Sequence, residues 1–212
     1  MFDALISVNI PSAFRGAGTV LWFGSTIRTL TNARENAVVG GRAGGYGKMK
    51  ILIIGSLYFC VDVNLKDRVI AACRELGTEI ARKGHTIIVG SDNAKTVDLY
   101  VVQGANLVPK KQKLIVHLPE RDDAGENRRI APFSHQRAEF PNITEISYRA
   151  SKGPWSVGRT YAIREADVVI VIGGARGAAQ VGYSASALNK PVLAIPYFGG
   201  SAVEIWDTIS PY

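Results

Sequence analysis

The stretch that decides the fold is Ala166-Asp167-Val168-Val169-Ile170-Val171-Ile172-Gly173-Gly174-Ala175-Arg176-Gly177. Its unbroken β-branched run, Val168–Ile172, is typical of a strand that is buried on both faces of a parallel sheet. A glycine-rich turn follows the run directly, and the Ala-rich segment Ala178–Leu188 then predicts a helix. A strand, a glycine turn and a helix in this order predict one βα unit of an α/β protein.

The same alternation of strand and helix continues on both sides of this unit. Short apolar runs predict further strands at Lys50–Ile54, Thr86–Val89, Lys113–Leu118, Ile143–Tyr148 and Pro191–Ile195. Capping residues and helical spacing predict helices from Asn64 to Gly84, from Asp92 to about Gly104, from Pro154 to about Ala166, and from Phe198-Gly199-Gly200 through Trp206. Because the predicted strands alternate with helices, the predicted fold class is α/β, a doubly wound, mainly parallel sheet in a Rossmann-like three-layer sandwich. Right-handed crossovers would join the parallel strands.

Length and composition limit the domain organisation. The chain has 212 residues, of which 47% are hydrophobic, so it fits one globular domain with an appendage and is too apolar for a disordered chain. Two cysteines, Cys60 and Cys73, are too few for a disulfide framework or a Cys-based zinc site. The three histidines show no metal-ligand spacing, so we expect no metal and no cofactor.

Residues 1–48 differ from the rest of the chain. They are rich in Gly, Ala and Arg, contain only two acidic residues, and sustain no helical or strand period. Because Met49 stands directly before the first predicted strand, we predict that residues 1–48 are a disordered leader or a start-site extension; a transit peptide and a structured segment are the alternatives. Without this segment the formal charge falls from +7 to +4, which weakens the case for a nucleic-acid partner.

The candidate site lies in the loops that follow the predicted strands. In a doubly wound sheet, ligands bind at the carboxyl ends of the strands, where the strand order reverses. The loop Gly173-Gly174-Ala175-Arg176-Gly177 leads into a helix N-terminus, whose free N–H groups suit a phosphate, and Arg176 adds a positive charge. The alternative is that these glycines only permit tight packing of the strand on the helix.

Three further loops at the same edge carry weaker signals. Gly55-Ser56 and Gly90-Ser91 are small enough for a ligand to approach the backbone, and we expect Ser56 and Ser91 to face a ribose. Asp92 either bonds a ribose hydroxyl or caps the following helix. Phe198, followed by Gly199-Gly200, either stacks on a base or fills the edge of the sheet.

The side chains near these loops complete the candidate set. Arg149 and Arg159 flank the helix that precedes the glycine loop, and both lie on the approach to the site in this topology. His117 alternates with Val116 and Leu118 and is expected to be structural. The polar segment 119–141 predicts a long surface loop near the site.

These motifs together resemble the SLOG superfamily. This Rossmann-like group includes the Lonely Guy cytokinin-activating hydrolases, the DNA-processing protein A family, and the nucleotide-sensor domains of TRPM channels and bacterial defence proteins. The resemblance covers most of residues 49–209 and is strongest in Gly158-Arg159-Thr160, in Ala166–Gly174 and in Asn189–Gly200. It is closest to the sensor-type members, which implies binding of a nucleotide related to NAD or ADP-ribose, including cyclic forms.

The chain departs from the enzymes of this group at two positions of the glycine loop, and Arg159 is offset by one residue from the catalytic arginine that precedes the strand in those enzymes. Lonely Guy enzymes carry a Pro-Gly-Gly-x-Gly-Thr-x-x-Glu loop, in which the Thr contacts phosphate and the Glu is catalytic; here Ala178 and Val181 occupy those positions. Cleavage of an N-glycosidic bond benefits from a carboxylate, so the loss of that Glu favours binding without catalysis.

Two alternatives to a binding protein stay open. One is an N-glycosidic hydrolase or transferase, like a Lonely Guy phosphoribohydrolase or a nucleoside deoxyribosyltransferase, with its carboxylate from Asp92, Glu120, Asp122 or Asp123. The other is a sensor domain of a larger effector.

The expected function is binding or sensing of a nucleotide or an NAD- or ADP-ribose-related small molecule. We expect a cytoplasmic protein with a small-molecule nucleotide as partner and no membrane contact, while the resemblance leaves a homodimer or a higher homo-oligomer open. The predicted site residues are Gly55, Ser56, Gly90, Ser91, Arg159, Gly173, Gly174, Ala175, Arg176, Gly177, Phe198, Gly199 and Gly200.

Overall fold

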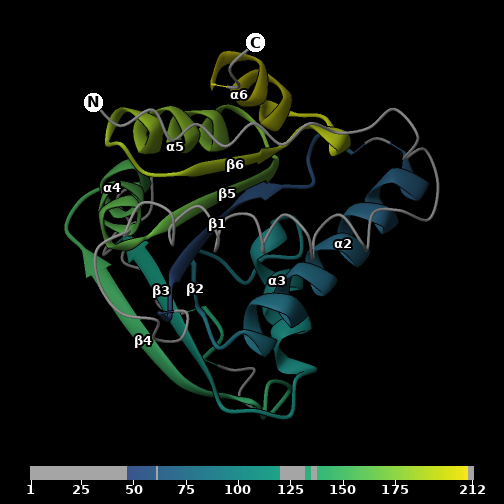
Figure 1. Ribbon diagram of the computed structural model, residues 1–212, viewed down its shortest axis with the longest axis vertical. Helices are drawn as coiled ribbons and strands as arrows, with labels where there is room; N and C mark the ends of the chain where they lie inside the picture. The colour runs from purple at the N-terminus through teal and green to yellow at the C-terminus, as the bar shows by residue number, and fades with distance from the viewer. Residues whose placement is uncertain (1–46, 61, 120–131, 135–137, 210–212) are drawn as a thin grey trace. The chain divides into compact units, whose positions relative to one another are not determined.

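The computed structural model describes residues 47–60, 62–119, 132–134 and 138–209 (Figure 1). The chain divides into two units, and every described helix and strand belongs to the unit Lys48–Ile209. The leader predicted over residues 1–48 lies almost wholly outside the described residues and stays a prediction. Most of the loop predicted over residues 119–141 lies outside them as well.

One six-stranded parallel sheet forms the centre of this unit, in the order β4-β3-β2-β1-β5-β6. Its strands are β1 (Lys50–Ser56), β2 (Thr86–Val89), β3 (Gln112–Pro119), β4 (Ile143–Ser151), β5 (Val168–Gly173) and β6 (Val192–Ile195). Every residue of β5 is buried, as its unbroken β-branched run predicts. The predicted α/β class and its parallel sheet are therefore confirmed.

Helices cover both faces of the sheet, which completes the predicted three-layer sandwich (Figure 1). On one face α2 (Val63–Arg82) packs against α3 (Val97–Asn106). On the other face lie α4 (Trp155–Glu165), α5 (Arg176–Ala187) and α6 (Ser201–Ile209), and the short 3-10 turn η1 (Pro196–Phe198) joins β6 to α6. Within the described ranges, none of these helices has the length and apolarity that crossing a membrane requires.

Two helix starts differ from the sequence predictions. The N-cap of α2 is Asp62, whose Oδ1 accepts a hydrogen bond from the Asn64 N–H at 2.8 Å, so the predicted cap at Asn64 is wrong. Helix α3 begins at Val97 and not at Asp92, because the preceding residues are held against the end of β1. There the Leu57 N–H donates to the Lys95 carbonyl at 2.8 Å, and a helical path cannot satisfy this bond.

The site is positioned by the pairing of β1 with β5. Helix α2 follows β1 on one face of the sheet and α5 follows β5 on the other (Figure 1), so the chain leaves the two carboxyl ends in opposite directions. Gly55 permits this pairing to continue to the end of β1, since a Cβ there would lie 2.0 Å from the Ile172 carbonyl oxygen. The crevice of a doubly wound fold therefore opens beside Gly55.

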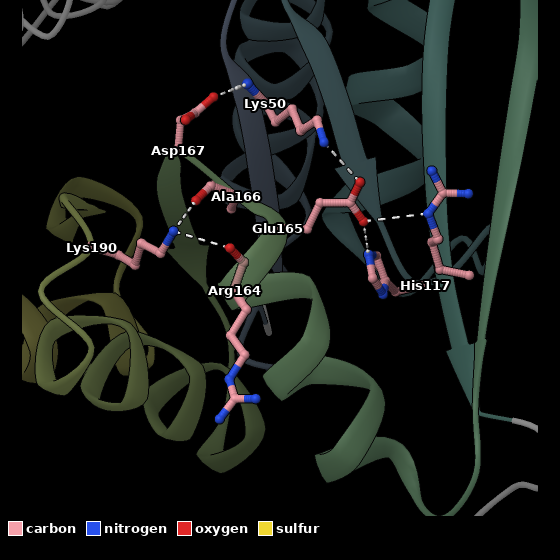
Figure 2. A network of polar contacts seen from close by, with 8 residues as sticks. Lys50, His117, Arg164, Glu165, Ala166, Asp167 and Lys190 are labelled. Carbon is pink, nitrogen blue, oxygen red and sulfur yellow. Dashed lines mark hydrogen bonds and ion pairs between the residues drawn. The ribbon is translucent and has the colours of Figure 1, made fainter.

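A network of polar contacts lies at the opposite, amino-terminal edge of β1 and β5 (Figure 2). Asp167 Oδ2 accepts from the Lys50 N–H at 2.8 Å, and the Asp167 N–H donates to the Lys50 carbonyl at 2.8 Å. Lys190 Nζ donates to the carbonyls of Arg164 at 3.1 Å and Ala166 at 2.7 Å, which places a cation at the C-terminus of α4. Two of the motifs that carry the resemblance, Ala166-Asp167 and Asn189-Lys190, thus have a structural use.

The crossing of α2 and α3 yields a test of the fold. A Cβ at Gly104 would lie 1.8 Å from the Arg74 carbonyl oxygen, and one at Gly77 would lie 1.9 Å from the Val101 carbonyl oxygen. We predict that Gly104→Ala lowers the free energy of unfolding by about 2 kcal/mol, because the two helices must move apart. Urea denaturation measures this loss. Gly47→Ala is the matched control, since a Cβ there meets nothing within 4 Å, and an equal change in both variants would contradict the prediction.

Candidate functional site

A cavity of about 300 Å³ lies at the carboxyl ends of β1 and β2, lined by the sheet and by helices α4 and α5. The lining from α4 comes from one helical face, represented by Trp155, Arg159 and Ala162. The cavity brings together about half of the predicted site residues, namely Gly55, Ser56, Gly90, Ser91, Arg159, Ala175 and Gly177. The crevice expected from the strand order is therefore a real cavity in this fold.

An anion-attracting corner forms where α4 meets the start of α5. The N-cap of α5 is Ala175, which offers no side-chain acceptor to the first N–H groups of the helix. Arg159 Nη1 lies 3.1 Å from the point that a Cβ at Gly177 would occupy, so the glycine admits the guanidinium to the helix end. The guanidinium also lies 6.0 Å from the ring centroid of Trp155. A fixed cation and a helix N-terminus, which both attract anions, thus meet at the cavity wall.

The first two glycines of the predicted phosphate loop have packing contacts instead. Gly173 and Gly174 have φ values of 55° and 88°. A Cβ at Gly173 would lie 1.9 Å from the ring of Phe59, and one at Gly200 would lie 2.6 Å from the Gly174 carbonyl oxygen. The Gly174 N–H donates to the Ser56 carbonyl at 3.3 Å. These glycines join the loops that follow β1, β5 and β6.

The other predicted residues outside the cavity lining are Arg176, Phe198 and Gly199. The Arg176 side chain is exposed at the start of α5. Phe198 is only 2% exposed and packs edge-on against Tyr197, with 5.1 Å between the ring centroids. Gly199 ends η1 with a φ of 81°. Phe198 therefore fills the edge of the sheet, and Arg159 rather than Arg176 reaches the cavity.

Asp98, in the first turn of α3, is a site residue that the sequence analysis did not find. Its carboxylate is 3% exposed, lines the cavity, and accepts hydrogen bonds from the N–H groups of Gly90 at 2.9 Å and Ser91 at 3.2 Å. Burial raises the pKa of Asp98 to about 6, although these N–H groups and the charge of Arg159 oppose the increase. The only signal in the sequence is an acid set between the apolar Val97 and Leu99.

Of the carboxylates that the sequence singles out, Asp92 is described by the structure and is not part of this lining. Asp92 Oδ2 accepts from the Phe133 N–H at 2.9 Å, so it holds a neighbouring segment and does not cap α3. Glu120, Asp122 and Asp123 lie outside the described residues. The Ser91 hydroxyl accepts from the Asn93 N–H at 3.1 Å, which shapes the loop after β2.

Two buried polar atoms on residues of the lining have no hydrogen-bond partner within the described part of the chain. They are Ser56 Oγ on β1 and His117 Nδ1 on β3. The opposite ring nitrogen of His117, Nε2, lies 2.9 Å from Glu165 Oε2 (Figure 2). Since buried polar groups in folded proteins are nearly always hydrogen-bonded, these two atoms lack a partner that most folded proteins would supply. Among the described residues, no group of three or more His, Cys, Asp or Glu side chains is placed to hold a metal ion.

Comparison with known proteins bears on the fold. No family model matches the chain, and no curated protein matches it. Its structure is similar to the X-ray structure of TM1055, a structural genomics target, with a TM-score of 0.54 and 24% identity over 75% of this chain and 81% of that chain. It is also similar to the molybdenum cofactor binding protein from the phototrophic bacterium Rippkaea orientalis, with a TM-score of 0.47 and 16% identity over 78% of this chain and 86% of that chain. The likeness to TM1055 supports the α/β fold alone.

The pKa of Asp98 gives a prediction about stability. Because the value in the folded protein, about 6, exceeds the ordinary 3.8, the proton on Asp98 stabilises the fold fully below pH 3.8, and this contribution is lost as the pH rises through 6. Asp98→Asn removes the buried charge and keeps an acceptor for the loop. We predict that the stability of Asp98→Asn relative to the natural protein increases by about 1 kcal/mol from pH 5 to pH 7.5.

Urea denaturation of both proteins at the two pH values measures this difference. Asp207→Asn, on α6 and outside the cavity lining, is the control for a general effect of charge. A relative stability of Asp98→Asn that stays constant with pH would show that the carboxyl group is not perturbed in the fold.

Proposed function

We propose that this protein binds a nucleotide or an NAD- or ADP-ribose-related small molecule, with a phosphate against the N-terminus of α5 and Arg159. The observation that carries this proposal is the contact of the Arg159 guanidinium with Gly177 at the wall of a cavity. A phosphate accepts hydrogen bonds from both the backbone N–H groups and the guanidinium. The buried Ser56 hydroxyl, which has no partner among the described residues, adds a polar group for a sugar.

The resemblance to the SLOG superfamily supports the same class of ligand. The residues that carry it include Gly158-Arg159-Thr160, and Arg159 is the arginine that faces the cavity. Ala178 and Val181, which replace the Thr and the catalytic Glu of the Lonely Guy loop, both line the cavity and are 7% and 2% exposed. The wall where those enzymes carry a carboxylate is therefore apolar, which supports binding without that chemistry.

A binding panel tests the proposal. NAD, ADP-ribose, cyclic ADP-ribose and AMP are added to the full chain, and binding is followed by thermal shift and by calorimetry. We predict that at least one of them binds and that Arg159→Ala weakens its binding by about tenfold or more, the cost of a lost charged hydrogen bond to phosphate.

Two other arginines serve as matched controls for this panel. Arg164 lies on the same helix as Arg159 with an exposed side chain, and Arg176 is exposed at the start of α5. Arg164→Ala and Arg176→Ala should leave the affinity within about twofold of the natural protein. Loss of binding in Arg176→Ala but not in Arg159→Ala would move the phosphate to the outer side of the loop. No shift with any compound would overturn the proposal.

A second candidate function is hydrolysis of an N-glycosidic bond, and Asp98 is the observation that favours it. A buried carboxyl group with a pKa of about 6 is suited to accept and return a proton near neutral pH. Water would add to the anomeric carbon, the bond from that carbon to the base nitrogen would break, and the proton lost by the water would reach the leaving base through Asp98.

Release of free base separates the two functions. We expect that AMP incubated with the natural protein yields no adenine above a protein-free control, as measured by liquid chromatography. Adenine that accumulates with the natural protein and not with Asp98→Asn would establish hydrolysis in place of simple binding.

A further inference from the structure

The strongest group that the proposed phosphate site does not use is His117. Its ring is almost completely buried, with the residue 5% exposed, and the residue lines the cavity. Nε2 lies 2.9 Å from Glu165 Oε2 at the C-terminal end of α4 (Figure 2), whereas Nδ1 is buried without a partner among the described residues. One side of the ring is therefore fixed by the protein, and the other is left for a different group.

The surroundings of Glu165 decide which ring nitrogen carries the proton. Lys50 Nζ lies 2.9 Å from Oε1, and Arg149 Nε lies 3.5 Å from Oε2. Burial raises the pKa of Glu165, but Lys50, His117 and Arg149 outweigh it, so the pKa is lowered and the carboxylate is ionised. An ionised carboxylate only accepts hydrogen bonds, so Nε2 must donate.

The protonation of His117 follows from this geometry. Burial lowers the pKa of His117, although Glu165 opposes the change, so near neutral pH the ring holds one proton. That proton is on Nε2, which leaves a lone pair on Nδ1. His117 thus presents a neutral acceptor that its bond with Glu165 holds in one orientation.

The strand register places this acceptor at the far end of the cavity from the phosphate corner. Val89, the last residue of β2, pairs with Val116 on β3. Gly90 and His117 are the next residues on the two chains, so they lie side by side at this edge of the sheet. Ser56 lies on β1, two strand spacings from β3, or about 10 Å across the sheet. The Gly174 N–H donates to the Ser56 carbonyl, so the loop before α5 lies beside Ser56, and the same span separates His117 from the start of α5 and leaves room for a sugar and a base.

An aromatic surface lies along this path. The Trp155 ring packs over Gly90, with one ring carbon 3.3 Å from the point that a Cβ at Gly90 would occupy. The carbonyl oxygen of His117 lies 3.5 Å from the same point, so Trp155 and His117 meet beside Gly90. A planar base on the indole would bring its edge to the histidine.

We propose that His117 Nδ1 accepts a hydrogen bond from the exocyclic amino group of a nucleobase, so that the cavity selects an amino-bearing base such as adenine. This inference rests on the proposed function, since it requires the phosphate at Gly177 and Arg159. The ribose hydroxyls are closer to the phosphate than the base is, so they meet the Ser56 end of the cavity. A keto or unsubstituted base edge would leave the Nδ1 lone pair buried and unpaired, which lowers affinity.

Two substitutions of His117 separate its two nitrogens. His117→Gln can keep a donor to Glu165 but removes the acceptor at the Nδ1 position, whereas His117→Asn can place an amide oxygen there and gives up the contact with Glu165. The ligands are AMP and purine riboside 5′-monophosphate, which lacks the amino group, and their affinities are measured by calorimetry. Circular dichroism and thermal unfolding of each variant show whether it is folded.

We expect AMP to bind the natural protein about tenfold more tightly than purine riboside 5′-monophosphate, and His117→Gln to remove this preference. His117→Asn should retain most of it. In ¹⁵N NMR spectra of the natural protein, the Nδ1 resonance of His117 should shift on addition of AMP and not on addition of the analogue.

The outcomes distinguish this inference from the proposed function. If AMP binds, Arg159→Ala weakens it and Arg164→Ala does not, but both nucleotides bind equally or His117→Gln keeps the preference, the role of His117 is refuted and the phosphate site stands. If neither nucleotide binds the natural protein and the wider panel gives no shift, the proposed function fails and this inference fails with it.

Discussion

The parallel pairing of β1 with β5 is the interaction on which the rest of the structure depends. It runs from Ile51 with Val168 to Ser56 with Gly173, between two strands whose following helices leave to opposite faces of the sheet. A shift by one residue would turn every side chain of β5 to the other face and bring a side chain against the Ile172 carbonyl. Gly55 at one end and the double contact of Asp167 with Lys50 at the other therefore fix the register that places the cavity.

Helix α4 connects the two polar regions that this pairing creates. Its first turns carry Trp155 and Arg159 to the cavity, and its last residue, Glu165, holds Lys50 and His117. Lys190 Nζ donates hydrogen bonds to the carbonyls of Arg164 and Ala166 at the C-terminal end of the helix. The helix is thus anchored at one end by ion pairs, while its other end presents a guanidinium to the cavity.

The strands and the site edge were predictable because they follow from simple constraints on the chain. A strand buried on both faces needs an unbroken apolar run, as in β5, and the parallel order places the loops that follow the strands at one edge. The edge strand β4 differs, since most of its residues are exposed or half-buried and its sequence mixes apolar with polar residues. The helix starts were harder to predict. Asp62 and Asn64 are both good N-cap residues for α2, and the sequence does not decide between them. The start of α3 depends on the hydrogen bond from the Leu57 N–H to the Lys95 carbonyl, which is a tertiary contact.

The roles of individual side chains could not be predicted to the same extent. Arg159 and Arg176 both adjoin the glycine loop in the sequence, and only the packing of α4 on α5 decides which one reaches the cavity. The helix predicted from Asp92 places Asp98 in its second turn, and only the later start at Val97 brings its carboxylate to the N–H groups of Gly90 and Ser91. The expectation that His117 is structural accounts for its bond to Glu165 but not for its place in the cavity lining.

The glycine crossing of α2 and α3 has a mechanical consequence for the two faces of the sheet. At Gly77 and Gly104 no layer of side chains separates the helix backbones, so neither helix can shift without losing direct backbone contact. On the opposite face, α4 and α5 are separated by the cavity over part of their length. A molecule that enters the cavity would therefore lie on the face of the sheet opposite to the helix pair whose backbones are in direct contact.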